Sequence, residues 1–343
     1  MNRLLKITTL AVLAGALALL AGLWAADRAL NTPLDVPADG AVFEVRSGSS
    51  LAAVSRDLAA AGWLRYPELF NWYARLAGQA ESIHAGEYRI DPGTTPVLLL
   101  KKFVDGDVRL YSFTIVEGWN YRELLAALGT EPALRSTLAP EDWPSLLQTL
   151  GADAAHPEGL FLPETYRFPR GTSDVELLRQ AYELMQETLA AEWSQRRDGL
   201  PLASPYEALV LASIVEKETA RADERARIAG VFVRRLQQGM RLQTDPTVIY
   251  GLGESFDGNL RRRDLRSDTP YNTYTRGGLP PTPIAMPGRA AIRAALQPAD
   301  GDALYFVATG LGDGSHKFSA TRAEHEAAVR EYLARRRASQ DGK

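Results

Sequence analysis

The chain has 343 residues, of which 45% are hydrophobic, so it is long enough for two or three domains with buried cores. Its net charge of −3 offers no electrostatic basis for binding nucleic acid. The chain contains no cysteine, which excludes disulfides, a thiol nucleophile, thiolate metal sites and a lipid attached through an N-terminal cysteine.

A membrane signal lies at the N-terminus. Residues 7–26 carry no charge and are mostly Ala, Leu, Val and Gly, and about 20 such residues span a bilayer as a helix. Arg3 and Lys6 precede this run, so the positive-inside rule predicts a cytoplasmic tip and a single transmembrane anchor over residues 1–26. The bulk of the chain then lies outside the cytoplasm. A cleaved signal peptide is the alternative, with a weak cleavage site around residues 24–26.

Two short α+β patterns follow a Pro-containing linker at residues 27–40. Residues 43–46 alternate as in a strand, a turn containing Gly48 follows, and residues 51–61 have helical spacing. We expect a small module over residues 41–110 that resembles the LysM-like modules of wall-binding proteins. An ordinary βα unit without affinity for sugar is the alternative.

The same order returns about seventy residues later, with a strand at 113–116, Gly118 in the turn and a helix at 121–128. This predicts a second α+β unit and connecting region over residues 111–200. That region also contains a buried loop or short strand at 159–167 and an amphipathic helix at 174–193.

A strongly apolar helix opens the predicted catalytic domain, residues 201–337. Ser204 and Glu207 form a capping box with Pro205 at the first helical position, and the helix ends on Glu216 and Glu218. Because a carboxylate at the end of a buried helix loses solvation, its pKa should rise toward neutrality, as a general acid requires. Further helices are expected at 222–238, 288–296 and 321–337, a strand at 303–308, and mostly loop over 251–287.

The predicted fold class is therefore α+β. It comprises an N-terminal transmembrane helix, the LysM-like module, and a mixed α/β catalytic domain with a buried Glu-bearing helix. Four scattered histidines and the lack of cysteine predict neither a metal site nor a cofactor.

Only one glutamate of the pair can face a cleft, because two residues along a helix turn the side chain by about 200°. The residues themselves do not decide between Glu216 and Glu218. Asp245 is the best candidate for a second carboxylate, although Asp before Pro also suits a turn, and Glu164 is a weaker candidate. A hydrolytic glycosidase uses two carboxylates, whereas one acid/base suffices if a substrate hydroxyl attacks intramolecularly.

Several motifs closely resemble the MltG (YceG-like) family of endolytic murein transglycosylases. The most specific are Glu-Lys-Glu-Thr at residues 216–219 and Gln-Thr-Asp-Pro-Thr at 243–247. Further matching segments cover nearly the whole chain: residues 85–89, 116–118, 160–166, 271–275, 278–281, 284–288, 305–308, 316–318 and 324–325.

The resemblance implies that Glu218 is the catalytic acid/base. It also suggests a set of residues for the glycan cleft through motif membership: Gln243, Thr244, Asp245, Tyr250, Asn272 and Tyr274. The implied reaction cleaves the bond between N-acetylmuramic acid and N-acetylglucosamine in nascent strands and leaves 1,6-anhydro ends.

The resemblance further implies a single-pass protein of the inner (plasma) membrane with its bulk in the periplasm. Its expected partners are peptidoglycan glycan strands and the wall-synthesis machinery, including penicillin-binding proteins, and its expected role is to terminate glycan polymerisation. Two alternatives remain open: a muramidase-type hydrolase that uses Glu218 with Asp245, and a non-catalytic wall-binding scaffold.

Overall fold

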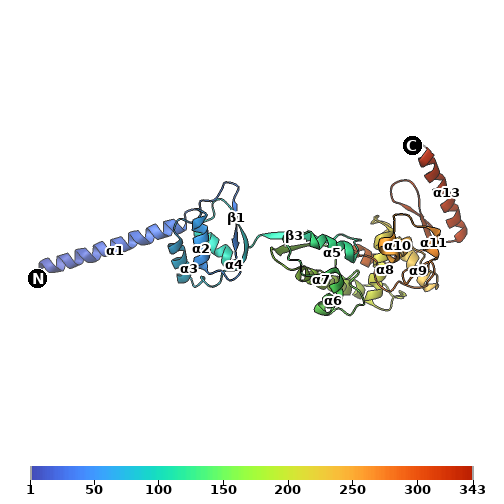
Figure 1. The fold of residues 1–343 in the computed structure, drawn as a ribbon, viewed down its shortest axis with the longest axis horizontal. Coiled ribbons are helices and arrows are strands. Elements are labelled where there is room, and N and C mark those ends of the chain that lie inside the picture. Colours follow the sequence, from blue (N-terminus) through green and yellow to red (C-terminus); the bar gives the residue numbers. More distant parts are fainter. Residues whose placement is uncertain (1, 342–343) are drawn as a thin grey trace. The chain divides into compact units, whose positions relative to one another are not determined.

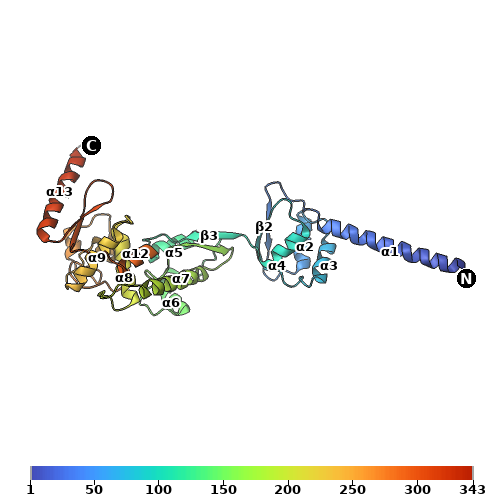
Figure 2. The same ribbon diagram turned by 180° about the vertical axis from the view of Figure 1, so that it is seen from behind.

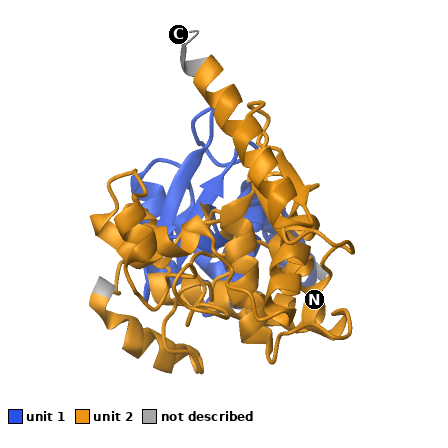
Figure 3. Ribbon diagram, turned by 90° about the vertical axis from the view of Figure 1, so that its right-hand side faces the viewer, with its two compact units in different colours: residues 1–111, 167–171 blue, residues 112–166, 172–343 orange. Residues whose placement is uncertain are grey.

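The computed structural model describes residues 2–341 as a mixed helix and sheet fold. The chain divides into two compact units, one made of the residues up to 111 together with 167–171, the other of 112–166 and the residues from 172 on (Figure 3). The strands of the described part form three two-stranded sheets, with the orders β1–β2, β3–β4 and β5–β6. This arrangement agrees with the predicted α+β class.

Helix α1 (Asn2–Leu30) contains the predicted apolar run and is long and apolar enough from Leu5 to Leu30 to cross a membrane. It continues four residues past the expected boundary at residue 26. Leu30 is 7% exposed, and Leu34 lies in the core of unit 1. The segment expected to be a linker is therefore helical to Leu30 and packed beyond it, because its leucines bury their apolar side chains.

Unit 1 confirms the predicted first strand and helix. Between them, Gly48 adopts φ +76°, a conformation that glycine takes without steric cost. Strands β1 and β2 pair antiparallel, with Phe43 opposite Tyr88, and both rings pack against Phe103. The elements of this unit are β1 (Ala41–Val45), α2 (Leu51–Ala60), α3 (Pro67–Leu76), β2 (Gly86–Ile90) and α4 (Pro96–Asp105).

The second strand–turn–helix pattern is also present, shifted by a few residues. Strand β3 (Leu110–Thr114) ends two residues earlier than predicted and pairs with β4 (Thr165–Pro169). Gly118 has φ +79°, and a capping box between Asn120 and Glu123 starts α5 (Tyr121–Gly129). The connecting elements are η1 (Pro140–Asp142), α6 (Trp143–Leu150) and α7 (Asp174–Ser194).

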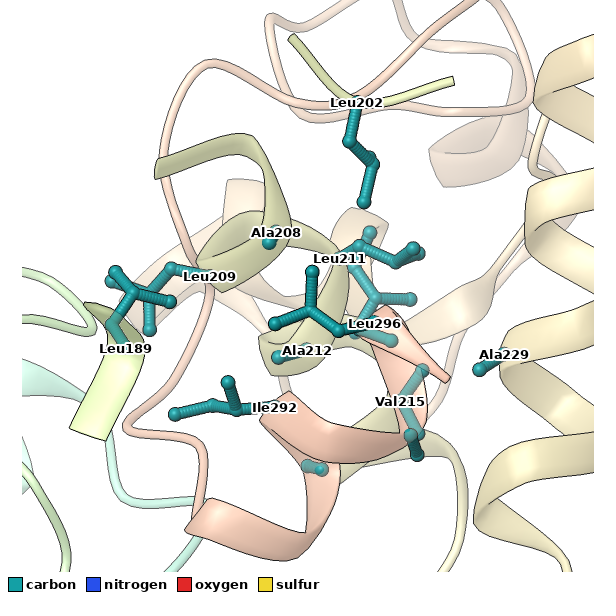
Figure 4. Close-up of a cluster of buried hydrophobic side chains, with 14 of the residues drawn as sticks. Leu189, Leu202, Ala208, Leu209, Leu211, Ala212, Val215, Ala229, Ile292 and Leu296 are labelled. Carbon is teal, nitrogen blue, oxygen red and sulfur yellow. The ribbon is translucent and has the colours of Figure 1, made fainter. Parts of the chain in front are cut away.

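Helix α8 (Pro205–Glu218) lies in the core of unit 2, and every residue from Ala208 to Val215 is buried. Figure 4 shows its side chains packed among Leu189 of α7, Ala229 and Ile292. The last two belong to α9 (Arg225–Gln237) and α12 (Arg289–Leu296). Burial on all sides fixes the position of the C-terminal end of α8, where Glu218 stands.

Two local predictions at α8 and α9 need correction. Ser204 accepts a hydrogen bond from the Glu207 N–H, but the Glu207 carboxylate accepts from the N–H of Ala203 at 2.6 Å, so the capping box is incomplete. Helix α9 begins three residues later than predicted. The Thr219 hydroxyl accepts from the N–H of Arg221 and holds this stretch in a turn.

The remaining elements surround the end of α8. They are α10 (Asp245–Leu252), η2 (Gly253–Ser255), α11 (Arg262–Arg266), β5 (Tyr305–Ala308), β6 (His316–Ser319) and α13 (Arg322–Asp341). Strands β5 and β6 form an antiparallel pair that contacts α13. The helices α10, α11 and the strand β6 were not predicted, whereas β5, α12 and α13 were.

Candidate functional site

A cleft of about 790 Å³ opens in unit 2 at the end of α8. Glu218 lies in its wall and is partly exposed to it. The other walls come from α9, the segment before α10, the β5 strand and one face of α13. The lining residues are Arg235, Met240, Leu242, Gln243, Asp245, Tyr274, Tyr305, Phe306, Arg322, His325, Glu326, Val329 and Arg330.

Glu218 has the environment of a general acid. Burial raises the pKa of its carboxyl to about 7, a hydrogen bond from Thr244 opposes this, and the charge of Asp245 adds to it. The Thr244 hydroxyl donates to Oε1, one of the two carboxyl oxygens. A carboxyl with this pKa is substantially protonated near neutral pH and can return to the carboxylate within one turnover.

Glu216 points elsewhere on the helix. Its carboxylate accepts a hydrogen bond from the Gly288 N–H at 3.0 Å and contacts Arg225 at 3.4 Å. A Cβ at Gly288 would fall 1.9 Å from Oε1 of Glu117, so a larger residue there would displace the end of the Glu117 side chain. Glu216 thus joins α8 to the start of α12, and Glu218 alone of the pair lines the cleft.

Thr244, which binds Glu218, follows a residue with a strained backbone conformation. Gln243 has φ +51°, which non-glycine residues seldom adopt and which commonly marks functional sites. The Thr244 N–H donates to Oγ1 of Thr273 at 3.1 Å, and the Thr247 hydroxyl lies 2.8 Å from the carbonyl of Thr244 and 2.9 Å from Oγ1 of Thr273. These buried threonines fix the backbone that presents the Thr244 hydroxyl. Thr244 itself is 2% exposed, so it contacts Glu218 rather than the open cleft.

Asp245 and Tyr274 form a second polar pair in the cleft. The Tyr274 hydroxyl donates to Oδ1 of Asp245 at 2.5 Å. Asp245 is the first residue of α10, where a carboxylate is favoured by the unpaired N–H groups of the helix start. The structure therefore brings Gln243, Asp245 and Tyr274 to the same cleft as Glu218.

Tyr250 and Asn272 lie outside the cleft lining. The Tyr250 hydroxyl donates to Oε2 of Glu158 at 2.9 Å, and its ring packs against Tyr271. Asn272 is fully buried, and its Nδ2 lies within hydrogen-bonding distance of three backbone carbonyls, including that of Ser267 at 2.7 Å. Both residues stabilise the loops around the cleft.

Sequence reasoning did not assign most of the other lining residues to the cleft, among them Arg235, Tyr305 and His325, which contact one another. Arg235 of α9 is 7% exposed and donates to the carbonyls of Leu304 and Leu242, both at 2.6 Å. Its guanidinium lies 5.1 Å from the ring centre of Tyr305, which stacks on His325 at 5.1 Å. Tyr305 and His325 belong to two of the motifs quoted above, so their membership was visible but their position was not.

Within the part of the chain that the structure describes, no group of three or more His, Asp or Glu side chains is arranged to hold a metal ion.

Comparison with known proteins finds relatives that match most of the chain. The YceG-like family matches residues 43–331. A Bacillus subtilis protein named endolytic murein transglycosylase is 30% identical over 85% of this chain and 84% of its own length. A Streptococcus pneumoniae protein of the same name is 26% identical over 84% of this chain, which spans only 58% of that longer relative.

A solved structure is similar as well. The crystal structure of a YceG-like protein from Listeria monocytogenes has 30% sequence identity, covers 85% of this chain and 99% of its own, and gives a TM-score of 0.53. The family match covers far more than half of the 343 residues. The chain therefore belongs to the YceG-like family.

Proposed function

We propose that this protein is an endolytic peptidoglycan lytic transglycosylase in which Glu218 is the single acid/base. The observation that carries the proposal is the carboxyl of Glu218, whose pKa burial raises to about 7 and which faces a cleft large enough for a glycan segment. The names of the relatives from Bacillus and Streptococcus support the same reaction class.

The proposed reaction needs no second carboxylate. Glu218 donates its proton to the glycosidic oxygen between N-acetylmuramic acid and N-acetylglucosamine as the bond from C1 breaks. The resulting carboxylate then accepts the proton of the muramic acid C6 hydroxyl, whose oxygen bonds to C1. The product is a 1,6-anhydro end, no water is consumed, and Glu218 regains its proton.

Thr244 is assigned a positioning role in this reaction. Its hydroxyl engages Oε1, which leaves Oε2 as the oxygen that carries the exchangeable proton. Because the threonine contacts around residues 244, 247 and 273 fix that hydroxyl, the carboxyl is held in one orientation. Gln243, Asp245 and Tyr274 are proposed to contact the glycan.

The remaining regions fit an anchored enzyme. Residues 1–26 are proposed as a cytoplasmic tip and inner-membrane anchor, with the rest of the chain in the periplasm. The β1–α2–α3–β2 order of unit 1, with β1 and β2 antiparallel, supports a LysM-like module within residues 41–110. Residues 201–337 are proposed as the catalytic domain. Cleavage of nascent strands beside the penicillin-binding proteins would terminate their polymerisation.

The test is mass spectrometry of products from uncrosslinked peptidoglycan strands treated with the wild type, Glu218→Gln and Glu216→Gln. We expect internal fragments with 1,6-anhydro ends from the wild type and from Glu216→Gln, because glutamine can still accept from Gly288, and none from Glu218→Gln. Reducing ends would instead assign a muramidase that uses Asp245 as a second carboxylate. Equal activity of Glu218→Gln and wild type would overturn the assignment of Glu218.

A further inference from the structure

One face of α3 in unit 1 is apolar and unburied. Phe70 and Ala74 are fully buried on the inner side of the helix. On the outer side, Trp72 is 50% exposed and Leu76, one turn later, is 67% exposed. Tyr66, the residue before the helix, is 49% exposed. Single exposed apolar residues are common on proteins, but large ones adjoining on one helix mark a contact surface.

The position of this face relative to α1 indicates what covers it. Helices α1 and α3 are in contact, and α3 lies on the side of unit 1 from which α1 leaves (Figures 1 and 2). The apolar run ends at Ala26, only four residues before the end of α1, or about 6 Å along the helix axis. The interfacial layer of a bilayer is itself several ångströms thick on each side.

The segment between α1 and the rest of unit 1 is short and is held in place by burial and hydrogen bonds. Leu30 is buried, and the side chains of Asn31 and Thr32 donate to the last carbonyls of the helix, at 2.9 and 2.7 Å. Leu34 is buried in the unit 1 core, and its N–H donates to the carbonyl of Thr94 at 2.8 Å. A membrane-spanning α1 would therefore hold unit 1 directly against the bilayer surface.

The side chains of this region have the chemistry of a membrane interface. The guanidinium of Arg65 lies 5.5 Å from the ring centre of Tyr66, and that of Arg28 lies 5.4 Å from the ring centre of Trp24 on α1. Trp and Tyr concentrate at the headgroup level of bilayers, and Arg extends its charge toward lipid phosphates. Exposed Arg75 adds a further cation on α3, and exposed Glu68, one turn before Trp72, adds a carboxylate on the same side of the helix.

We propose that the α3 face, defined as Tyr66, Trp72 and Leu76 with Arg65 and Arg75, rests in the headgroup layer of the membrane that α1 spans. The proposal rests on the proposed anchoring of α1. Stacking of Trp72 on a sugar is the rival use of an exposed aromatic. The exposed Leu76 one turn from Trp72 and the contact with α1 favour lipid, because an aliphatic side chain beside the ring gains most from burial in an apolar environment.

The test uses the absence of cysteine, which allows one label per molecule. Full-length Leu76→Cys carries an environment-sensitive fluorophore and is reconstituted in vesicles of phosphatidylcholine and phosphatidylglycerol that contain headgroup-region nitroxide lipids. Val42→Cys is the control, because Val42 is 41% exposed on β1, and the β1–β2 sheet lies at the end of unit 1 away from α1 (Figures 1 and 2). Leu17→Cys in α1 reports the anchor itself.

We expect several-fold stronger quenching of the label at 76 than of the label at 42. In parallel vesicles that carry acyl-chain nitroxide lipids instead, we expect the label at 17 to be quenched. Equal, weak quenching at 76 and 42 with a quenched label at 17 would overturn the α3 proposal and leave the anchor intact. Weak quenching at all three positions would overturn both. A label at 76 that reports water but is shielded by added glycan strands would assign the face to sugar instead.

Discussion

Burial raises the pKa of two glutamates of unit 2 to about the same value in different surroundings. Burial raises the pKa of Glu158 to about 7, as it does that of Glu218. Glu158 is 2% exposed and accepts from the Tyr121 N–H at 3.1 Å and from the Tyr250 hydroxyl at 2.9 Å. Glu218 accepts from the Thr244 hydroxyl and opens to the cleft.

Glu158 and Glu218 differ in the accessibility of their carboxyl oxygens and not in their pKa. Both carboxyls can carry a proton at neutral pH, but the oxygens of Glu158 are occupied by the start of α5 and by α10. Glu158 therefore joins two helices, whereas Glu218 can exchange its proton with a ligand. A shifted pKa identifies a functional candidate only together with a free oxygen and an open path to it.

The largest expected difference between the two sites is in rate. Glu218→Gln should lower kcat/KM on uncrosslinked glycan strands by about 10³-fold, because general acid–base catalysis contributes roughly 10²–10⁴. Glu158→Gln should retain activity within a few-fold, since glutamine can still accept from Tyr121 and Tyr250. Steady-state assays of both variants measure this difference in kcat/KM. If Glu158→Gln is fully folded and as inactive as Glu218→Gln, the proposed difference in role between the two glutamates is wrong.

The next effect concerns stability against pH. Folding raises the pKa of Glu158 from 4.5 to about 7, so the protonated carboxyl favours the folded state. Its contribution to the free energy of unfolding is fully present below pH 4.5 and is lost as the pH rises toward 7. The loss corresponds to about 3 kcal/mol of unfolding free energy at most. Glu158→Gln, which stays neutral, should flatten this pH dependence in urea titrations. Glu164→Gln, an exposed carboxyl, is the control and should leave the slope unchanged.

Thr244→Val should shift the pH–rate profile. Loss of the hydroxyl removes an interaction that lowers the pKa of Glu218, so that pKa rises and the alkaline limb of kcat/KM moves to higher pH. Thr244→Ser keeps the hydroxyl and should keep the wild-type limb. An unchanged limb in the valine variant would mean that Thr244 does not act on Glu218.

The smallest shift should come from Asp245→Asn, in the opposite direction. The charge of Asp245 raises the pKa of Glu218, so its removal lowers that pKa and moves the alkaline limb to lower pH. Tyr274→Phe keeps that charge and frees it from its hydrogen bond, so it should not move the limb downward. Complete loss of activity in Asp245→Asn with reducing-end products in the wild type would favour the two-carboxylate hydrolase.

Local signals in the sequence predicted the elements that have strong caps and regular spacing. Helices α2, α7 and α8 each begin at a serine N-cap, and α8 adds a continuous apolar run. The rotation of about 100° per residue also predicted that Glu216 and Glu218 diverge. The segments missed in unit 1, α3, β2 and α4, are short, and their packing depends on partners distant in the sequence.

Other errors came from signals that have two interpretations. Asp245-Pro246 suits a turn, but proline also suits the first turn of a helix, and here it opens α10. That Tyr250 and Asn272 contact the glycan stays a prediction from motif membership, and the sequence did not indicate their structural partners, Glu158 and the backbone carbonyl of Ser267. Glu158 attracted no notice, because its burial results from Tyr121 and Tyr250, 37 and 92 residues away.

The backbone conformation of Gln243 has opposite consequences for the stability of the fold and for the geometry of the site. Its φ of +51° would suit glycine without steric cost, so the side chain of Gln243 makes this turn less stable than a glycine would. A glycine there would also widen the range of conformations open to the adjacent Thr244, whose hydroxyl binds the Glu218 carboxyl. The side chain at position 243 therefore restricts the backbone on which the orientation of that carboxyl depends.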